Sequence, residues 1–153
     1  MKNDETFMRE ALSLACDAAR LGEIPVGAVV VRDGEIIGSG HNLRETNMSA
    51  TAHAEVLAIE KACAAVGSWR LSGCTLYVTL EPCPMCAGAI VNSRIDRVVY
   101  GCRDAVGGAC GSVINIGAYP FNHSFALTGG VLADESAALL SKFFAEKRKK
   151  KNI

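Results

Sequence analysis

The chain has 153 residues, of which 50% are hydrophobic and 21% are charged. This composition predicts a single globular domain, residues 1–153, with a core of its own. No apolar run approaches the ~20 residues that span a bilayer, which excludes a membrane-spanning class. The first five residues are polar and lack the apolar core of a signal peptide, so we expect a cytoplasmic protein.

The 16 basic and 16 acidic residues cancel, but they are unevenly distributed. Six basic residues and one acidic residue lie from position 142 onward, so the rest of the chain carries a net charge of −5. This basic C-terminal tail, from about residue 145, predicts a polyanionic partner such as nucleic acid, because lysine and arginine displace counterions from phosphates. A solvated, frayed end is the alternative interpretation of the same charges.

The seven cysteines are an odd number in a chain without an export signal, which argues against a disulfide framework. Five are expected to be small buried hydrophobic side chains: Cys16, Cys63, Cys74, Cys102 and Cys110. The remaining two, at positions 83 and 86, have the spacing of a ligand pair.

The first predicted element is an amphipathic helix from residue 4 to about residue 20. Its apolar residues recur at steps of three and four: Phe7, Met8, Ala11, Leu12, Ala15, Cys16 and Ala19. Gly22 is expected to end this helix. Two strand-like runs follow at 26–31 and 35–39, and the Asp33-Gly34 pair between them predicts a β-hairpin.

Helices and strands are expected to alternate in the rest of the chain. After a polar loop over 42–51, we predict a helix at 53–66, a strand at 75–80, a helix at 83–91, a strand at 97–100 and a helix at 134–149 with Asp134 as its N-cap. The glycine-rich stretch 101–117 gives no clear prediction. The alternation predicts an α/β fold, a mixed sheet covered by helices on both faces.

Two short motifs carry the residue types of a metal site: His-x-Glu at 53–55 and Pro-Cys-x-x-Cys at 82–86. Cys83 and Cys86 are three residues apart, so on a helix their side chains point to the same side. In the first turn, the helix dipole and free N–H groups favour thiolates, which are the form that binds metal. Prolines suit the entry to such a helix, because they lack the N–H that would be unpaired there.

Two thiolates and one imidazole, from Cys83, Cys86 and His53, make three protein ligands. A structural zinc ion takes four protein ligands, whereas a catalytic zinc ion keeps one position for water. A carboxylate nearby can then accept the proton of that water, and Glu55 lies two residues after the histidine. We therefore predict a catalytic zinc site in which Glu55 moves the protons.

Each motif alone also has a simpler interpretation. The Cys-x-x-Cys pair could be a redox dithiol, or half of a four-cysteine structural zinc site together with Cys63 and Cys74. His53 could merely cap its helix. The two motifs together match the signature of zinc-dependent nucleobase deaminases, which favours the catalytic site. Glu81 is expected only to cap the following helix or to pair with a basic residue, and His41 and His123 are not expected to bind metal.

Further motifs extend the comparison over residues 7–147. These are Ile24-Pro25-Val26-Gly27-Ala28-Val29, Gly40-His41-Asn42, Thr51-Ala52-His53-Ala54-Glu55, Thr75 to Cys83, Ser93-Arg94-Ile95, Arg97-Val98-Val99-Tyr100-Gly101, and Gly129 to Phe144. In these motifs the sequence resembles the cytidine deaminase superfamily, and more closely its bacterial tRNA-specific adenosine deaminases.

This resemblance implies a three-layer fold, a five-stranded mixed sheet flanked by helices, in a homodimer with one zinc ion per subunit. It implies conversion of adenosine to inosine at the wobble position of an arginine tRNA, recognised through its anticodon stem-loop. By the same resemblance, Asn42 would hydrogen-bond the flipped base and Val26 would line its pocket. Asp104 would contact the nucleotide backbone, and Phe144 with the basic residues after it would contact the stem-loop.

Two features depart from the pattern of the tRNA enzymes. Pro84 stands where those enzymes more often have valine, and Cys-Pro-Met-Cys also occurs in guanine and cytosine deaminases. The stretch 117–121 is also unusual. A deaminase of free bases or nucleosides, such as guanine or cytidine, therefore stays open as an alternative. A catalytically silent RNA-binding subunit is disfavoured because Glu55 is present.

Overall fold

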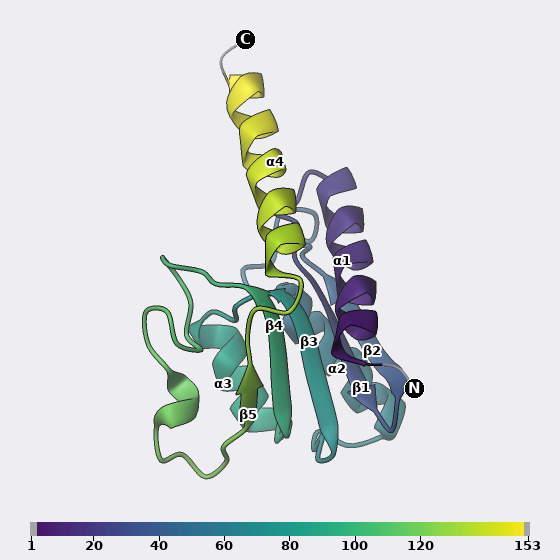
Figure 1. Ribbon diagram of the computed structural model, residues 1–153. Helices are drawn as coiled ribbons and strands as arrows, with labels where there is room; N and C mark the ends of the chain where they lie inside the picture. Colours follow the sequence, from purple (N-terminus) through teal and green to yellow (C-terminus); the bar gives the residue numbers. More distant parts are fainter. Residues whose placement is uncertain (1–2, 152–153) are drawn as a thin grey trace.

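The structure is a computed structural model that describes residues 3–151. In chain order its elements are α1 (Asp4–Arg20), β1 (Gly27–Arg32), β2 (Glu35–His41), α2 (Ala54–Val66), β3 (Cys74–Leu80), α3 (Pro84–Ser93), β4 (Arg97–Cys102), the short 3₁₀ helix η1 (Ile116–Ala118), β5 (Ala126–Thr128) and α4 (Ala133–Lys151). The strands form one sheet in the order β2-β1-β3-β4-β5 (Figure 1).

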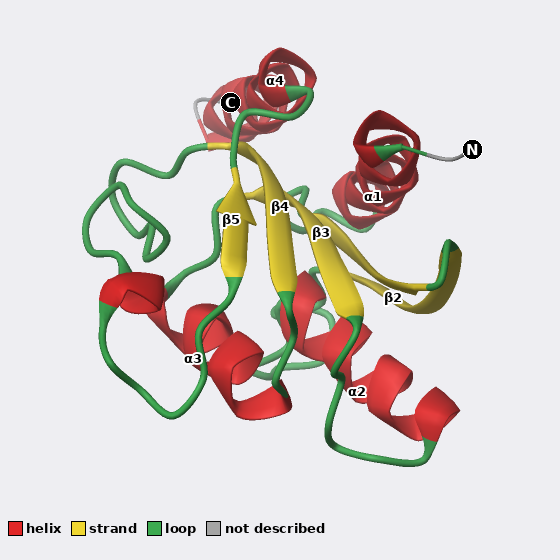
Figure 2. Ribbon diagram, turned by 60° about the horizontal axis from the view of Figure 1, so that its bottom comes forward, coloured by secondary structure: helices red, strands yellow, loops and turns green. Residues whose placement is uncertain are grey.

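The sheet is the middle of three layers. Helices α1 and α4 lie on one face, and α2 and α3 lie on the other (Figure 2). Strand β1 pairs antiparallel with β2 and β3, whereas β3, β4 and β5 run parallel to one another. The predicted α/β fold, with a mixed five-stranded sheet between helices, is therefore confirmed.

Strand topology brings distant parts of the chain to one end of the sheet. The carboxyl ends of the parallel strands β3 and β4 lie at the same edge, where β3 leads into residue 81 and β4 into residue 103. Because β1 is antiparallel to β3, its first residue, Gly27, lies there too, opposite His41 at the end of β2. Ligand sites of open α/β sheets form at this carboxyl edge.

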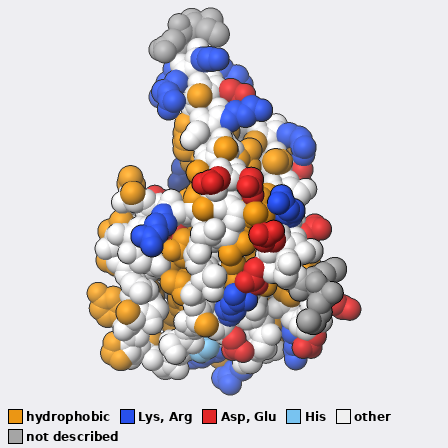
Figure 3. Space-filling view, in the orientation of Figure 1, with side chains coloured by type: hydrophobic (Ala, Val, Ile, Leu, Met, Phe, Trp, Pro, Cys, Tyr) orange, Lys and Arg blue, Asp and Glu red, His pale blue; other side chains and the backbone are white. Residues whose placement is uncertain are grey.

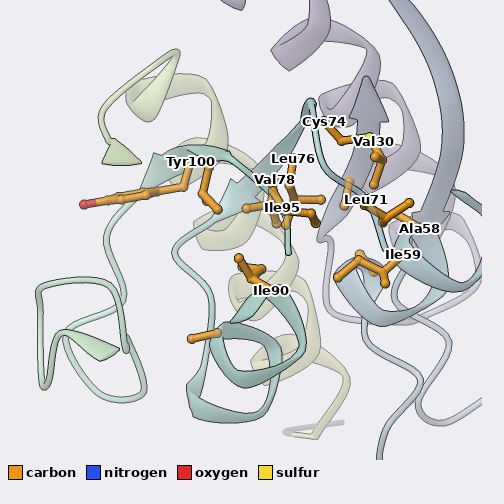
Figure 4. Close-up of a cluster of buried hydrophobic side chains, with 14 of the residues drawn as sticks. Val30, Ala58, Ile59, Leu71, Cys74, Leu76, Val78, Ile90, Ile95 and Tyr100 are labelled. Carbon is orange, nitrogen blue, oxygen red and sulfur yellow. The ribbon is translucent and has the colours of Figure 1, made fainter. Parts of the chain in front are cut away.

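The central strands are buried on both faces, which explains their nearly continuous apolar sequences. Alternate side chains on β1, β3 and β4 pack against α2 and α3, among them Val30, Leu76 and Val78 (Figure 4). Val98 belongs to the same cluster. The intervening residues face α1: Val29, Val31, Tyr77 and Val99. The sheet is therefore a rigid platform for the loops at its carboxyl edge.

The hairpin glycines let the helices lie directly on the sheet. A Cβ atom at Gly40 would be 2.7 Å from the carbonyl oxygen of Ala54 in α2, and one at Gly38 would collide with the carbonyl oxygen of Ala58. On the other face, a Cβ at Gly27 would collide with the backbone of α1. Side chains at these positions would separate the layers, because backbone atoms of a packed helix cannot move aside locally.

A polar clasp joins the start of α1 to the sheet. The carboxylate of Asp4 accepts two hydrogen bonds from the Arg97 guanidinium, at 2.9 and 2.7 Å, and one from the Tyr77 hydroxyl at 2.8 Å. The hydrogen bond from Arg97 is the main reason that the pKa of Asp4 lies below its usual value. Burial and the bond to Asp4 raise the pKa of Tyr77 to about 12.

Local signals predicted most elements, with differences at their ends. The turn of the hairpin has positive φ at both Asp33 and Gly34, as the Asp-Gly pair predicts, and Gly22 ends α1 with φ +79°. Helix α4 begins at Ala133, so the prediction of Asp134 as N-cap is wrong. Asp134 lies in the first turn, where its negative charge interacts favourably with the helix dipole. Strand β5 and helix η1 were not predicted from the residues.

The C-terminal basic stretch is helical within the described residues. Helix α4 runs to Lys151 and extends beyond the body of the molecule (Figure 1). The expectation of a frayed end is therefore wrong for the stretch up to that residue. None of the described helices combines the length and apolarity needed to cross a membrane. All seven cysteines are free thiols.

Candidate metal centre and active site

Three of the predicted site residues meet at one point. The Nδ1 atom of His53 lies 3.6 Å from the Sγ atom of Cys83 and 3.5 Å from the Sγ atom of Cys86. Zinc bonds of roughly 2.05 Å to nitrogen and 2.3 Å to sulfur, at a tetrahedral angle, place such atoms about 3.6 Å apart. The donor set therefore fits a tetrahedral zinc ion in both chemistry and spacing.

The positions of these side chains follow from two helix starts. His53 is the N-cap of α2 and Cys83 is the N-cap of α3, with Pro84 as the first helical residue. Neither side chain forms a capping hydrogen bond with its own helix, so both can serve as ligands of a common metal ion. Cys86 follows in the first turn of α3. The positive ends of two helix dipoles thus converge on the two sulfurs and stabilise negative charge there.

Each of the two thiols shifts the pKa of the other. The pKa of Cys83 falls to about 4, chiefly because the Cys86 thiol hydrogen-bonds to it and also because of the bond with His53. The same hydrogen bond and its own burial raise the pKa of Cys86. The lowered pKa favours the thiolate form of Cys83, and a bound metal ion would displace the proton of Cys86 to make the second thiolate.

Glu55 lies beside this donor set in the first turn of α2. Only 4% of the residue is exposed, and burial is the main cause that raises the pKa of its carboxyl group to about 7. A group with a pKa near the working pH can both accept and donate a proton.

These residues line a pocket of about 130 Å³ at the carboxyl edge of the sheet. Its lining comprises Ile24, Val26, Asn42, Arg44, His53, Ala54, Glu55, Leu80, Glu81, Cys83 and Asp104. Of the predicted substrate contacts, Val26, Asn42 and Asp104 are present and Phe144 is absent. The lining combines apolar side chains with charged and amide groups, as a site for a polar ring requires.

Asn42 is held in a fixed orientation. Its Nδ2 atom donates to the carbonyl oxygen of Ile24 at 3.2 Å, and its Oδ1 atom accepts from the backbone N–H of Arg44 at 3.1 Å. An amide has two N–H donors and two acceptor lone pairs, so each end keeps one further hydrogen-bonding position.

Asp104 is similarly held by its own loop. Its Oδ1 atom accepts from the backbone N–H groups of Val106 and Gly107, at 3.1 and 3.0 Å. No hydrogen bond among the described residues uses the Oδ2 atom, which leaves one carboxylate oxygen for a substrate hydroxyl.

Phe144 lies outside this pocket, on α4, with 41% of the residue exposed. It lines a neighbouring pocket with Glu23, Lys147 and others, and the two pockets share Ile24, Asn42 and Arg44. A contact between Phe144 and a substrate stays a prediction, and it requires a substrate longer than one nucleoside.

Glu81 has a role that the sequence did not predict. It neither caps α3 nor pairs with a basic residue; it accepts hydrogen bonds from the loop after β4, including the backbone N–H groups of Asp104, Cys110 and Ser112. Burial raises the pKa of Glu81, but these bonds together with that of the Ser112 hydroxyl outweigh burial, so the pKa lies below its usual value. The carboxylate is therefore ionised and saturated.

Arg44 was also missed, together with the apolar lining residues Ile24 and Leu80. The signal that could have found Arg44 is topological: the antiparallel hairpin puts the end of β2 beside the start of β1, at the edge where β3 ends. Asn42 and Arg44, which follow β2, line the same pocket as Val26.

The competing metal assignments find no support in the described part of the chain. There, His53, Cys83 and Cys86 form the one group of three or more possible ligands within reach of a common ion. His41 ends strand β2, and the Nε2 atom of His123 donates to the carbonyl oxygen of Ile95 at 2.7 Å. The four-cysteine site with Cys63 and Cys74 is not formed.

Comparisons with known proteins agree with this site. Residues 1–102 match the family described as the cytidine and deoxycytidylate deaminase zinc-binding region, which includes all three candidate ligands and Glu55. The tRNA-specific adenosine deaminase of Bacillus subtilis is 53% identical over 152 residues, covering 99% of this chain and 94% of the relative.

Two solved structures are similar in fold. One comes from a study of A-to-I editing by tRNA:A34 deaminases at the wobble position; it has a TM-score of 0.85 and 44% identity and covers 88% of this chain and 98% of its own. A guanine deaminase from Nitrosomonas europaea has a TM-score of 0.80 and 27% identity, covering 95% of this chain and 86% of its own. Sequence, fold and site geometry agree, and the chain belongs to the cytidine and deoxycytidylate deaminase family, in the group of the tRNA-specific adenosine deaminases.

Proposed function

We propose that this chain is a zinc-dependent hydrolase that converts adenosine to inosine at the wobble position of tRNA. The observation that carries the proposal is a buried carboxyl group, Glu55, beside one imidazole and two thiols at tetrahedral spacing. The Bacillus subtilis relative is named for adenosine deamination in tRNA, and this supports the choice of substrate.

One zinc ion per chain would be held by His53, Cys83 and Cys86. When bound, such an ion supplies Lewis-acid activation of a water molecule, so that water is a nucleophile near neutral pH. Replacing Cys86 by alanine should remove the metal together with the activity. Metal analysis of the purified variant checks this, and an undiminished zinc content would contradict the ligand set.

Hydrolysis adds water to C6 of the purine and releases ammonia, so protons must reach N1 and the departing nitrogen. Three carboxyl groups line the pocket. The oxygens of Glu81 are saturated by backbone N–H groups and the Ser112 hydroxyl, and of the other two groups Glu55 is the one in the first turn of α2, next to the candidate ligand His53. Glu55 is therefore the group that accepts one proton of the attacking water and delivers it to N1. It then takes the remaining proton from the hydroxyl on C6 and delivers it to the amino group, which leaves as ammonia while the C6–N bond breaks and the C6 carbonyl forms.

Base recognition is assigned to Asn42 and Val26, which line the same pocket as Glu55. The remaining hydrogen-bonding positions of the Asn42 amide would pair with the edge of the flipped purine, and Val26 would contact its ring. The free Oδ2 atom of Asp104 would accept a hydrogen bond from the sugar of the same or a neighbouring nucleotide.

The RNA itself would be bound along α4. Lys and Arg side chains gather on the part of this helix that extends beyond the body (Figure 3), and the last turn contains four of them. Phe144 lies between these charges and the pocket, lining a second pocket that shares Asn42 and Arg44 with the first. An anticodon loop, whose bases can be splayed out of the stack, suits a surface of this kind.

Deamination of a free base such as guanine is the second candidate, favoured by the similarity to a guanine deaminase. A substrate panel separates the two: an anticodon stem-loop of an arginine tRNA against free adenosine, cytidine and guanine, with ammonia release measured for each. We expect ammonia from the stem-loop at a much higher kcat/KM. Faster turnover of any free base would contradict the tRNA assignment.

We further propose that the enzyme is a homodimer that packs through the exposed face of α3. Gly88 lies on this face, and a Cβ atom there would meet nothing within 4 Å. A glycine inside a helix costs about 1 kcal/mol relative to alanine, so close approach by a second copy would explain it. Gly88→Leu should give a monomer by analytical ultracentrifugation, and a dimer of this variant would exclude the face.

The proposed extent and location follow from the same assignment. The whole of residues 1–153 would act as one deaminase domain, with the stretch from about residue 145 as its basic RNA-contacting end. We also propose a cytoplasmic location, where a tRNA substrate would be available.

A further inference from the structure

A buried carboxylate organises one wall of the pocket. Glu81 is 2% exposed, and its two oxygens divide the loop after β4 between them. Oε2 accepts the backbone N–H groups of Cys110 and Ser112, both at 3.0 Å. Oε1 accepts the backbone N–H of Asp104 at 3.2 Å and the hydroxyl of Ser112. One side chain thus fixes both the beginning and the end of this loop.

The loop is built to admit this carboxylate. A Cβ atom at Gly108 would collide with the Glu81 side chain and lie 2.5 Å from the carbonyl oxygen of Asp104, so a larger residue cannot stand there. Backbone hydrogen bonds on either side join the same two segments: Glu81 N–H to Cys102 O at 2.9 Å, and Ala109 N–H to Pro82 O at 2.8 Å. The segment that carries the metal ligand Cys83 and the loop that carries Asp104 therefore form one unit.

We propose that Glu81 is a positioning residue for substrate binding, which holds Asp104 in place against the pocket through the backbone N–H of that residue. The inference rests on the proposed function, in which Asp104 contacts the nucleotide. It assigns Glu81 no contact with substrate or metal. Glu81 affects substrate binding by holding the loop that carries Asp104.

Replacing Glu81 by glutamine distinguishes the hydrogen bond from Asp104 from the hydrogen bonds that Cys110 and Ser112 donate. The amide oxygen of Gln can occupy the Oε2 position and keep the bonds from Cys110 and Ser112. The amide nitrogen then occupies the Oε1 position, where it can donate to the Ser112 hydroxyl but faces the N–H of Asp104. Two donors cannot bond to each other, so Glu81→Gln breaks the link to Asp104 while keeping the far side of the loop.

The kinetic test uses the zinc-loaded enzyme and an anticodon stem-loop. Loss of a hydrogen bond to a charged acceptor should raise KM about tenfold for Glu81→Gln, with kcat and zinc content nearly unchanged. In an Asp104→Ala background the same substitution should add little further, because its effect passes through Asp104. An unchanged KM, a multiplied effect in that background, or a joint loss of kcat and zinc would overturn the proposal.

Glu23→Gln is the matched control. Glu23 is also a buried carboxylate, 1% exposed, and it accepts the backbone N–H groups of Glu45 and Thr46 from the loop on the opposite wall. Its effect on KM should multiply with that of Asp104→Ala, because it acts on a different loop. Ser112→Ala, which removes only a hydroxyl and leaves the bond from the Asp104 N–H intact, is a second control, and it should leave KM nearly unchanged.

A second readout does not depend on activity. Hydrogen exchange should speed up at the amide of Asp104 in Glu81→Gln while the amides of Cys110 and Ser112 stay protected. Equal protection of Asp104 in both proteins would overturn the proposal even if wild-type enzyme deaminated no RNA. Failure of the wild-type enzyme on the stem-loop would instead refute the proposed function, so the two failures are distinguishable.

Discussion

Glu55 combines two properties that rarely occur together in a carboxyl group: it is almost fully buried, and it faces a pocket beside possible metal ligands. We expect Glu55→Gln to lower the single-turnover deamination rate by ~10²–10⁴-fold, because an amide of the same shape cannot shuttle protons. The measurement is inosine formation in the stem-loop under excess enzyme, with zinc content determined in parallel.

The control for this substitution lies on the same helix. Glu60 is exposed on α2, and Glu60→Gln should leave both rate and zinc content unchanged. A wild-type rate for Glu55→Gln would show that another group moves the protons.

At the scale of single residues, the sequence predicted the donor set because chemistry restricts it. A metal site needs His and Cys at ligand spacing, and few other patterns produce His-x-Glu together with Pro-Cys-x-x-Cys. Glu81 and Arg44 could not be identified in this way. Their roles depend on which parts of the chain lie beside them after folding. The sequence around a single acidic or basic residue does not indicate those contacts.

The clasp between α1 and the sheet predicts a pH-dependent contribution to stability. Asp4 and Arg97 are each about one third exposed, so we expect Asp4→Asn to lower the free energy of unfolding by only about 1 kcal/mol at pH 7. Because folding lowers the pKa of Asp4, this stabilisation is present above its unfolded value of 3.8 and is lost as the pH falls below it. Urea unfolding of both proteins at pH 7 and pH 3 measures the difference.

Asp17→Asn on the same helix is the comparison for this clasp. Asp17 pairs with Arg20 on the surface, where both side chains are largely solvated, so its loss should have no measurable effect at either pH. A constant difference between Asp4→Asn and wild type across the pH range would contradict the assigned ion pair.

Helix α4 predicts salt-dependent RNA binding. Replacing Lys149, Lys150 and Lys151 by glutamine should weaken binding of the stem-loop, lower the slope of log KM against log salt by roughly 0.7 per lost phosphate contact and leave zinc content intact. The charge-matched comparison neutralises three exposed basic residues elsewhere: Arg9, Arg32 and Lys61. If both triple variants weakened stem-loop binding equally, the proposal that α4 binds the RNA would be wrong.

Elements with strong local signals were predictable, and their ends were less so. The Asp33-Gly34 turn and the apolar periodicity of α1 are encoded within a few residues. Strand β5 comprises only Ala126–Thr128 and is defined by its parallel pairing with β4, which is remote in sequence. A strand this short has no period that could distinguish it from a loop.

For the whole molecule, layer order followed from the alternation of elements, whereas the assembly of the pocket did not. Its lining comes from the ends of four strands and two helices that the sheet topology brings to one edge. In the proposed function the substrate depends on surfaces still further apart, since the base would enter the pocket while the rest of the RNA would bind along α4, which extends beyond the body of the molecule. Substrate choice was accordingly predicted through resemblance and not from the pocket residues.

Gly40 affects catalysis although it lies outside the active site. It contacts the backbone of Ala54, the residue between His53 and Glu55, so a single methyl group there would lift the start of α2 and shift the imidazole and the carboxyl group together. We expect Gly40→Ala to cost about 2 kcal/mol of stability and to weaken zinc retention, whereas Ser39→Ala beside it should do neither. In a mutational scan, substitutions at Gly40 would then reduce activity as strongly as substitutions of active-site residues, although this edge-strand position touches no reactant.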